Sequence, residues 1–265
     1  MTLSKLKLAV LGALVVPMTS VLAEEAPPAA EAASDFSFSA NVGLYSDYIF
    51  RGYTQTENNP ALQGGFDVEH ASGLYAGVWA SNVDWTTNTG AMTQNSLEVD
   101  LYAGFAGTFG DTGIGYDVGV LQFLYPGKDK PGADLEADAT ELYFGVSKDF
   151  GFASAGVTYY HVVSTDAWAF NDAEGSEYWS LDIDVPVGDA LTASFHVGDQ
   201  SFDGTGNSPY DYTDWKVNVE YAINDTYALG AFYTDTDMAK SAWGTTNQGT
   251  FMGDNAAGAY LSASF

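Results

Sequence analysis

The chain has 265 residues, of which 35 are acidic and 8 are basic, so its formal net charge at pH 7 is -27. An acidic balance of this size argues against nucleic acid and anionic lipid headgroups as partners, unless Ca²⁺ or Mg²⁺ bridges carboxylates to phosphates. The absence of cysteine fits export through an oxidising compartment, although it is not specific to it.

The first residues are typical of a secretory signal peptide, which we place at Met1–Ala23. Lys5 and Lys7 precede the apolar run Leu8–Pro17, and a small residue stands at the cleavage point. A membrane anchor is the alternative, but this run is too short to span a bilayer comfortably. Removal of the signal leaves six basic residues against 35 acidic ones, a net charge of -29. The segment Glu24–Ser34 has two prolines and no periodicity, which predicts a flexible periplasmic leader.

The stretch 46–85 shows the unit that the rest of the chain repeats. A strand ends in the polar loop Tyr53–Asn59, a second strand returns over Leu62–Glu69, and the tight turn His70–Gly73 reverses the chain into a third strand, Leu74–Val83. Apolar side chains occupy every second position, and the loops are long at one end of the strands and short at the other. This asymmetry is typical of a transmembrane β-barrel.

Residues within this stretch carry a resemblance to a known family. The pattern S-D-Y-x-F-R-G over Ser46–Gly52, followed by Gln55-Thr56, Pro60-Ala61, Gln63–Gly65 and Ser81–Val83, resembles the signature of the bacterial TorF family of porins. Order and spacing agree over this stretch, and the remainder of the chain agrees mainly in size and strand pattern. The resemblance implies a small outer-membrane barrel and indicates a location more than a substrate.

The same alternation continues to the C-terminus. In the strand 97–105, for example, Leu97 and Leu101 alternate with Glu98 and Asp100, which predicts one lipid-facing and one water-facing side. In the strand 114–125 the pattern is blurred, because both faces carry apolar residues. The expected strands are 36–51, 62–69, 74–83, 97–105, 114–125, 140–148, 153–163, 178–185, 191–198, 214–222, 227–234 and a last strand that ends at Phe265.

The hairpins repeat about every thirty-eight residues, a period that would also fit propeller blades. A blade would need four strands in that space, whereas the sequence offers two uninterrupted runs, as a tilted membrane crossing requires. We therefore expect an all-β fold over residues 35–265. It is a transmembrane antiparallel up-and-down β-barrel of about 12 strands, with short periplasmic turns and long extracellular loops.

The C-terminal strand gives an independent indication. Ala259, Leu261, Ala263 and Phe265 alternate, and the chain ends on the phenylalanine. A terminal aromatic residue on such a strand resembles the signal by which outer-membrane barrels are recognised for assembly. The 17 Tyr, 16 Phe and 6 Trp would supply interfacial aromatic girdles, although soluble β-proteins can also be rich in aromatic residues. The expected partners are outer-membrane lipid, lipopolysaccharide and the barrel assembly machinery.

Strand parity predicts a water-facing wall that is mainly acidic. Such a wall draws cations in and repels anions, so we expect a preference for small cations, lost at high salt, or for neutral solutes. The alternative is that the acids only hydrate a plugged interior. The predicted pore-lining acids are Asp47, Asp67, Glu69, Glu98, Asp100, Glu141, Asp182, Asp184, Asp214 and Glu220, with Arg51 and Lys216 as scarce cations.

Arg51 is the only arginine, and it shares its predicted inward face with acidic residues. A guanidinium among carboxylates serves either as a structural ion pair or as a constriction that contacts the solute. Inward aromatic residues could stack a sugar or a base, or could simply fill a narrow barrel. These aromatic residues are Tyr45, Tyr75, Trp79, Tyr102 and Tyr143.

The sequence offers little for catalysis, metal or cofactor binding. His161 with Ser164 is the one pairing that a lipid-acting barrel enzyme could use, and a histidine at the barrel rim is the simpler reading. Asp134, Glu136 and Asp138 could bind Ca²⁺ but lack an EF-hand pattern, so a solvated acidic loop is the default. The expected function is a porin-like channel for passive diffusion. A lipid-acting barrel enzyme and a non-conducting structural or adhesive barrel are the alternatives.

Overall fold

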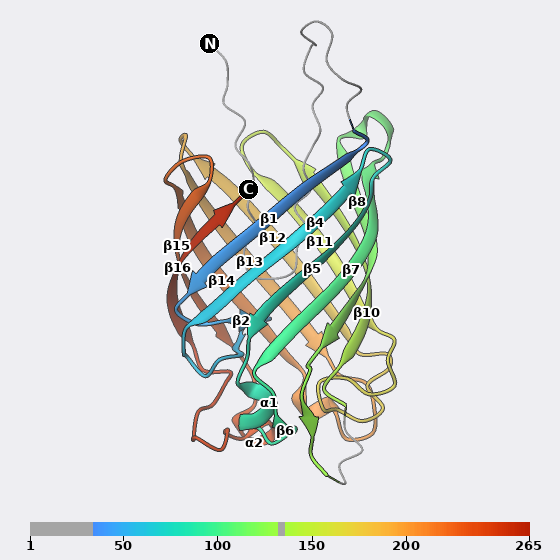
Figure 1. The fold of residues 1–265 in the computed structure, drawn as a ribbon, viewed down its shortest axis with the longest axis vertical. Coiled ribbons are helices and arrows are strands. Elements are labelled where there is room, and N and C mark those ends of the chain that lie inside the picture. Colours follow the sequence, from blue (N-terminus) through green and yellow to red (C-terminus); the bar gives the residue numbers. More distant parts are fainter. Residues whose placement is uncertain (1–33, 132–135) are drawn as a thin grey trace, which may run out of the picture.

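The computed structural model describes residues 34–131 and 136–265, which form one closed barrel of antiparallel strands (Figure 1). The predicted signal peptide and the leader up to residue 33 lie outside the described residues, as does Asp134. The predicted twelve-stranded architecture is confirmed. In ring order the strands are β1 (Phe36–Tyr45), β16 (Ala256–Ser264), β15 (Tyr227–Thr236), β14 (Tyr212–Ala222), β13 (Leu191–Ser201), β12 (Glu177–Val187), β11 (Ser154–Val162), β10 (Ala139–Asp149), β8 (Ile114–Leu124), β7 (Leu97–Thr108), β5 (Leu74–Asn82) and β4 (Ala61–His70).

The outer surface of the barrel is apolar because alternate side chains of each strand point away from the interior. On β7, Leu97, Leu101 and Phe105 are exposed, whereas Glu98 and Asp100 between them are buried. A continuous apolar belt of this extent is suited to hydrocarbon and not to water. Its members include Phe38, Val42, Leu44, Leu62, Phe66, Leu74, Val78, Val118, Val120, Leu142, Phe144, Leu181, Phe195, Val197, Val217, Val219, Leu229 and Leu261.

Aromatic side chains border this belt at both ends. Towards the long loops, Tyr159 packs on Trp179 with ring centroids 4.7 Å apart, and Trp215 packs on Tyr233 at 5.5 Å. In transmembrane barrels aromatic residues concentrate at the two rims of the apolar band, and these rings border the belt in the same way. At the short-turn end the exposed aromatic residues are Phe36, Phe109, Phe150, Phe152, Tyr221, Tyr227 and Phe265.

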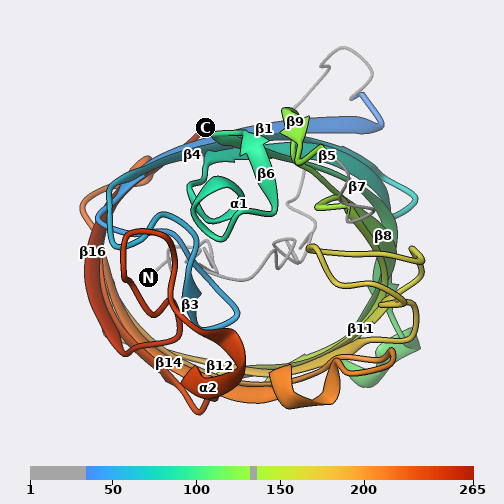
Figure 2. The same cartoon turned by 90° about the horizontal axis from the view of Figure 1, so that it is seen from below.

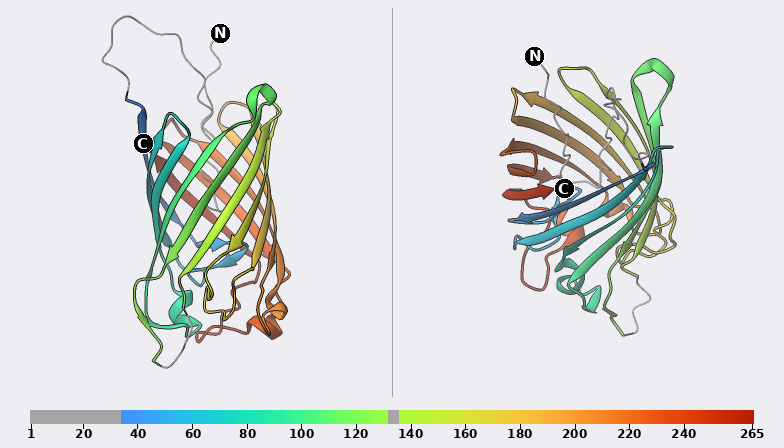
Figure 3. Two further views of the ribbon diagram at one scale, coloured as in Figure 1. Left: turned by 90° about the vertical axis from the view of Figure 1, so that its right-hand side faces the viewer. Right: turned by 45° about the horizontal axis from the view of Figure 1, so that its top comes forward.

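The connections are short at one end of the barrel and long at the other (Figure 3). The long loops hold the remaining elements, except for η1 (Gly110–Thr112), which lies in a short turn. No helix within the described ranges is long and apolar enough to cross a membrane. The elements of the long loops are β2 (Ile49–Phe50), β3 (Tyr53–Thr54), α1 (Trp85–Asn88), β6 (Met92–Gln94), β9 (Lys128–Asp129), η2 (Ser208–Tyr210) and α2 (Lys240–Trp243).

An apolar core fills the interior at the long-loop end. Loop residues such as Phe50 and Trp168 pack against Phe123 of the wall, with ring centroids 5.6 and 5.5 Å from it. This packing explains the blurred pattern of β8, where Leu121 and Phe123 point inward and are almost fully buried. Their apolar neighbours face the outer belt, so both faces of this strand are apolar for different reasons.

Inward tyrosines lie flat against the wall over glycines of neighbouring strands. The ring of Tyr75 covers Gly104, and the ring of Tyr102 covers Gly77, so that a Cβ at either glycine would collide with the ring. Cross-strand covering of glycine by an aromatic ring supports curvature in a sheet and fills space beside it. The tyrosines therefore narrow the interior of the barrel on the short-turn side of the loop core.

Candidate channel constriction

The first long loop folds into the barrel instead of extending the first strand. The expectation that this strand runs to Arg51 is wrong, because β1 ends at Tyr45 and the chain turns inward. Figure 2 views the barrel from the long-loop end and shows β3 inside the ring of strands. The carboxylate of Asp47 holds this fold, because its Oδ1 accepts hydrogen bonds from Thr54 Oγ1 at 2.6 Å and Thr56 Oγ1 at 2.9 Å. Asp47 thus lies in the inward loop and not on the wall where strand parity placed it.

The β2–β3 hairpin, residues 49–54, ends in a two-residue turn. Arg51 and Gly52 both have positive φ, 44° and 86°, as a type I′ hairpin turn requires at its two central positions. Gly52 also packs closely on the wall. A Cβ there would collide with Cβ of Asp214 and would stand 2.6 Å from Cγ2 of Thr236. The hairpin tip is therefore seated directly against β14 and β15.

From this tip the side chain of Arg51 reaches strands on the far arc of the ring. Its Nη2 donates to both oxygens of Glu141 on β10, at 2.9 and 2.7 Å, and its Nη1 donates to Gln200 on β13 at 2.9 Å. Strands β13 and β10 are each the fourth along the ring from β1 and β4, respectively. One guanidinium thus ties the loop to both sides of the opposite wall, and the predicted structural ion pair is present.

Aromatic faces enclose the same guanidinium. Its carbon lies 4.2 Å from the ring centroid of Tyr178, 4.9 Å from Phe50 and 5.0 Å from Tyr160. Burial by itself would lower the pKa of Arg51, but the Glu141 carboxylate outweighs it and the net pKa is raised. Arg51 is charged at any physiological pH, and the arrangement is a buried charge clamp.

Two more acids lie under the hairpin on β7. Tyr48 Oη donates to Glu98 Oε1 at 2.6 Å, and its own pKa is raised well above the ordinary value by burial and by nearby carboxylates. Asp100 is fully buried, and neither of its carboxylate oxygens has a hydrogen-bond partner among the described residues. Glu98 and Asp100 are therefore buried carboxyl groups of the inner wall, whereas the guanidinium of Arg51 is bonded to Glu141 and Gln200.

A second cluster surrounds His196 on β13. Its Nδ1 lies 2.7 Å from Asp182 Oδ1 and its Nε2 lies 3.1 Å from Asp214 Oδ1, while Tyr178 Oη donates to Asp214 Oδ2 at 2.9 Å. Asp214 also contacts the hairpin at Gly52. This cluster therefore forms the part of the wall on which the hairpin tip rests.

The short-turn half of the interior is a network of tyrosines and acids. Tyr75 Oη donates to Asp117 Oδ1 at 2.6 Å, Tyr102 Oη donates to Asp67, and Tyr260 Oη donates to Glu220 Oε2 at 3.0 Å. Tyr45 stacks on Tyr260 with ring centroids 5.1 Å apart. Of these three acids Glu220 is half-buried, whereas Asp67 and Asp117 are buried.

Most of the predicted inward residues lie on the inner wall, where they alternate with exposed apolar residues. Whether they line a conducting pore stays a prediction. Parity missed Asp117, because β8 is apolar on both faces, and it gave no role to His196 or Gln200. The predicted residues on the inner wall are Asp67, Glu69, Glu98, Asp100, Glu141, Asp182, Asp184, Asp214, Glu220, Lys216, Tyr45, Tyr75, Trp79, Tyr102 and Tyr143.

The residues considered for other chemistry are engaged elsewhere. His161 lies on the outer face near Tyr159 and Glu177, while Ser164 Oγ accepts a hydrogen bond from the backbone N–H of Thr140 at 3.1 Å. Asp138 accepts from the backbone N–H of Tyr125 at 2.7 Å. Among the described residues, no group of three or more His, Cys, Asp or Glu is placed to hold a metal ion.

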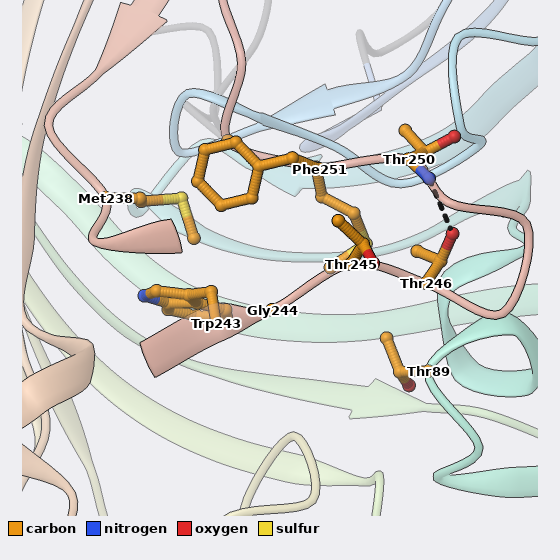
Figure 4. A pocket seen from close by; sticks show the side chains of 10 residues that line it. Thr89, Met238, Trp243, Gly244, Thr245, Thr246, Thr250 and Phe251 are labelled. Carbon is orange, nitrogen blue, oxygen red and sulfur yellow. Dashed lines mark hydrogen bonds between the residues drawn. The ribbon is translucent and has the colours of Figure 1, made fainter. Parts of the chain in front are cut away.

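A small cavity of about 90 Å³ lies among the loops at the mouth (Figure 4). Its lining is uncharged and combines threonines with Trp243, Phe251 and Met238. The backbone N–H of Thr250 donates to Thr246 Oγ1 at 3.2 Å, and this bond closes one side of the cavity. The cavity is separate from the Arg51 clamp and belongs to the packing of the last long loop.

Comparison with known families gives one match, over residues 29–265, to a family described as a bacterial protein of unknown function (Gcw_chp). The chain belongs to this family. Its description assigns no activity, and the finer resemblance to the TorF family of porins stays a prediction. No curated protein matches the chain.

Solved structures of outer-membrane channels share the fold. The KdgM porin in complex with disordered oligogalacturonate has a TM-score of 0.54 at 6% identity and covers 86% of this chain and 97% of that one. The COG4313 outer membrane channel from Pseudomonas putida F1 has a TM-score of 0.52 at 10% identity, with 91% and 99% covered. A TodX monoaromatic hydrocarbon channel mutant has a TM-score of 0.51 at 10% identity, with 88% and 90% covered. At such low identity the likeness shows the fold alone.

Proposed function

We propose that this protein is a porin-like channel of the bacterial outer membrane for passive diffusion of small solutes, with a preference for cations. The observation that carries the proposal is a closed barrel whose outside is an apolar belt and whose inside is a mainly acidic wall. Short turns would face the periplasm and long loops the exterior, as in barrels of this type. The solved channels with this fold support the assignment as analogues.

The charge of the interior favours cations. Among the described residues, only Arg51 and Lys216 are basic on the inner side, with His196 between two carboxylates. A wall of one sign inside a low-dielectric barrel raises the local concentration of counter-ions and excludes co-ions. The inner acids are Asp67, Glu69, Glu98, Asp100, Asp117, Glu141, Asp182, Asp184, Asp214 and Glu220.

The β2–β3 hairpin is the constriction in this proposal. It crosses the interior at the long-loop end, and the Arg51 clamp holds it there. The two strands of the hairpin are short, and only its turn packs against the wall. Displacement of the hairpin would therefore widen the passage through the barrel without separating strands of the wall. Conduction is then controlled by how well the hairpin stays seated.

Liposome swelling tests the channel directly. Proteoliposomes in isotonic solutions of small amino acids, sugars and salts should swell faster than empty liposomes, and swelling should slow as solute size increases. A variant in which a short Gly/Ser linker replaces residues 48–57 should swell faster than the wild type. If neither protein increases swelling for any solute, the channel proposal fails.

A non-conducting structural barrel is a second candidate, and the packed aromatic core at the long-loop end favours it. Such a core would make the wild type impermeable because loop side chains fill the bore. The hairpin-replaced variant distinguishes the two candidates. If liposomes with the wild type do not swell and liposomes with the variant do, the wild-type barrel is impermeable because the hairpin and the loop core block it.

A further inference from the structure

We infer that Asp100 and Glu98 bind a monovalent cation, of the alkali-metal or ammonium type, beneath the β2–β3 hairpin. This inference deepens the proposed channel function by assigning the groups that would set its selectivity. The binding itself can be measured without conduction.

The burial of Asp100 is the first argument. Its side chain is at 0% exposure on the inner face of β7, and both of its carboxylate oxygens lack a hydrogen-bond partner among the described residues. Desolvation of a carboxylate is so unfavourable that proteins pair such groups, bind a metal with them or keep them neutral. A counter-charge or a proton is therefore required at this position.

The neighbours of Asp100 increase this requirement. Glu98 and Glu141 lie close enough to repel its charge, and Glu98 is itself at 1% exposure. The guanidinium of Arg51 is committed to Glu141 and Gln200. Lys216 lies on β14 near Asp182 and Asp214, in the other cluster. The excess negative charge thus stays with the Asp100 and Glu98 pair.

The donors present favour a monovalent ion. Ca²⁺ takes six to eight oxygen ligands, and no group of three acidic or histidine side chains in the described ranges is placed to hold a metal. A singly charged ion would offset the charge of the Asp100 carboxylate, while the Glu98 carboxylate accepts a hydrogen bond from Tyr48 Oη. In the β-ladders Asp100 stands opposite Trp79 and Phe123, whose rings offer the apolar and π surface that suits a weakly hydrated cation.

Thermal unfolding in detergent micelles tests the site on the full-length mature protein. At constant ionic strength and pH, replacement of choline chloride by KCl should raise the melting temperature of the wild type by about 3 °C or more, since a ligand that binds only the folded state stabilises it. Asp100→Asn should remove this response. Without K⁺ this variant should melt above the wild type, because it buries no charge.

Asp111→Asn is the control, since Asp111 is an exposed acid in a short turn outside the inner wall and should leave the K⁺ response intact. A wild type that does not respond to K⁺, or an Asp100→Asn variant that still responds, would overturn the inference. Stabilisation by CaCl₂ at far lower concentration than by KCl would also overturn it. So would a melting temperature that falls with rising pH equally in K⁺ and choline, because a proton would then fill the site.

Bilayer recordings separate this inference from the proposed function. If K⁺ stabilises the protein but no conduction is recorded, the cation site is supported and the channel function is contradicted. If the protein conducts cations selectively but K⁺ does not stabilise it, the channel function is supported and the cation site is contradicted.

Discussion

Two kinds of interaction fix the side chain of Arg51 inside the barrel. The hydrogen bonds from Nη2 to both Glu141 oxygens and from Nη1 to Gln200 supply direction, and the rings around the guanidinium replace the water that it loses. Removal of only one partner leaves the other charge buried without compensation, which is the costly way to break such a pair.

We therefore predict that Arg51→Gln destabilises the protein by about 3–5 kcal/mol, because Glu141 remains buried and unpaired. The double variant Arg51→Gln with Glu141→Gln should recover a large part of this loss. The measurement is the free energy of unfolding from urea titration in lipid vesicles. Lys148→Gln, which removes a partly exposed cation, should change it by only about 0.5 kcal/mol. Equal losses for the single and double variants would contradict the ion pair.

Gly52 gives a second test at the same scale. Gly52→Ala should unseat the hairpin, because its Cβ meets Asp214 and Thr236, and should raise single-channel conductance or open time. Gly188→Ala is the control, since Gly188 also has positive φ, 74°, but a Cβ there meets nothing within 4 Å. Both variants carry a backbone cost of about 1–2 kcal/mol for the left-handed conformation. Identical conductance in the two variants would show that the tip does not control the path.

At the scale of elements, the hairpin depends on how Asp47 is held. Burial raises the pKa of Asp47 above its ordinary value near 3.8, and the hydrogen bonds from Thr54 and Thr56 oppose this only in part. A carboxyl group with a raised pKa keeps its proton more tightly in the folded hairpin than in the open loop. Its contribution therefore favours the seated hairpin at low pH, decreases as the pH rises from the open-loop pKa through the folded pKa, and is constant above it.

We therefore predict that opening of the hairpin increases as the pH rises from the open-loop pKa through the folded pKa of Asp47. Protection factors for the amide protons of Thr54 and Gln55, which donate to the carbonyls of Met252 and Tyr48, report the opening. Asp47→Asn keeps an acceptor for the two threonines and should abolish this pH dependence. Protection in the wild type that rises with pH would contradict the assignment.

The sequence predicts the strands well wherever one face meets the outer belt and the other meets water. On β7 and β14 most of the alternate residues are apolar and exposed, and parity placed Glu98, Asp100 and Asp214 on the opposite, buried face. Prediction fails where a segment lies inside the barrel, since both faces of β2 are covered. Ile49 and Phe50 are consecutive and both buried. That run of adjacent apolar residues before Arg51-Gly52 is the signal that could have revealed a hairpin turn.

At the scale of the whole molecule, the interior of the barrel has two halves of different polarity. Only one half reverses the arrangement of a soluble protein, with polar residues inside and apolar residues outside. The short-turn half has an acidic and tyrosine-rich wall, while the long-loop half has an apolar core built from loops. No strand pattern could show this division, because the loops that fill the long-loop half come from distant parts of the chain. The apolar belt outside is common to both halves.

The belt predicts behaviour of the intact protein. After removal of the signal peptide the chain should require detergent or lipid to stay dispersed, because its exposed apolar surface is continuous around the barrel. Sedimentation with and without detergent checks this. A monodisperse, water-soluble monomer in the absence of detergent would contradict a transmembrane barrel.

The most direct test of the channel account is the reversal potential of the purified protein in a planar bilayer under a KCl gradient. The acidic inner wall predicts a reversal potential of the sign for K⁺ permeation, which decreases toward zero as both salt concentrations are raised and the wall is screened. Anion-selective reversal, or a bilayer that stays silent even with the hairpin replaced, would contradict the account.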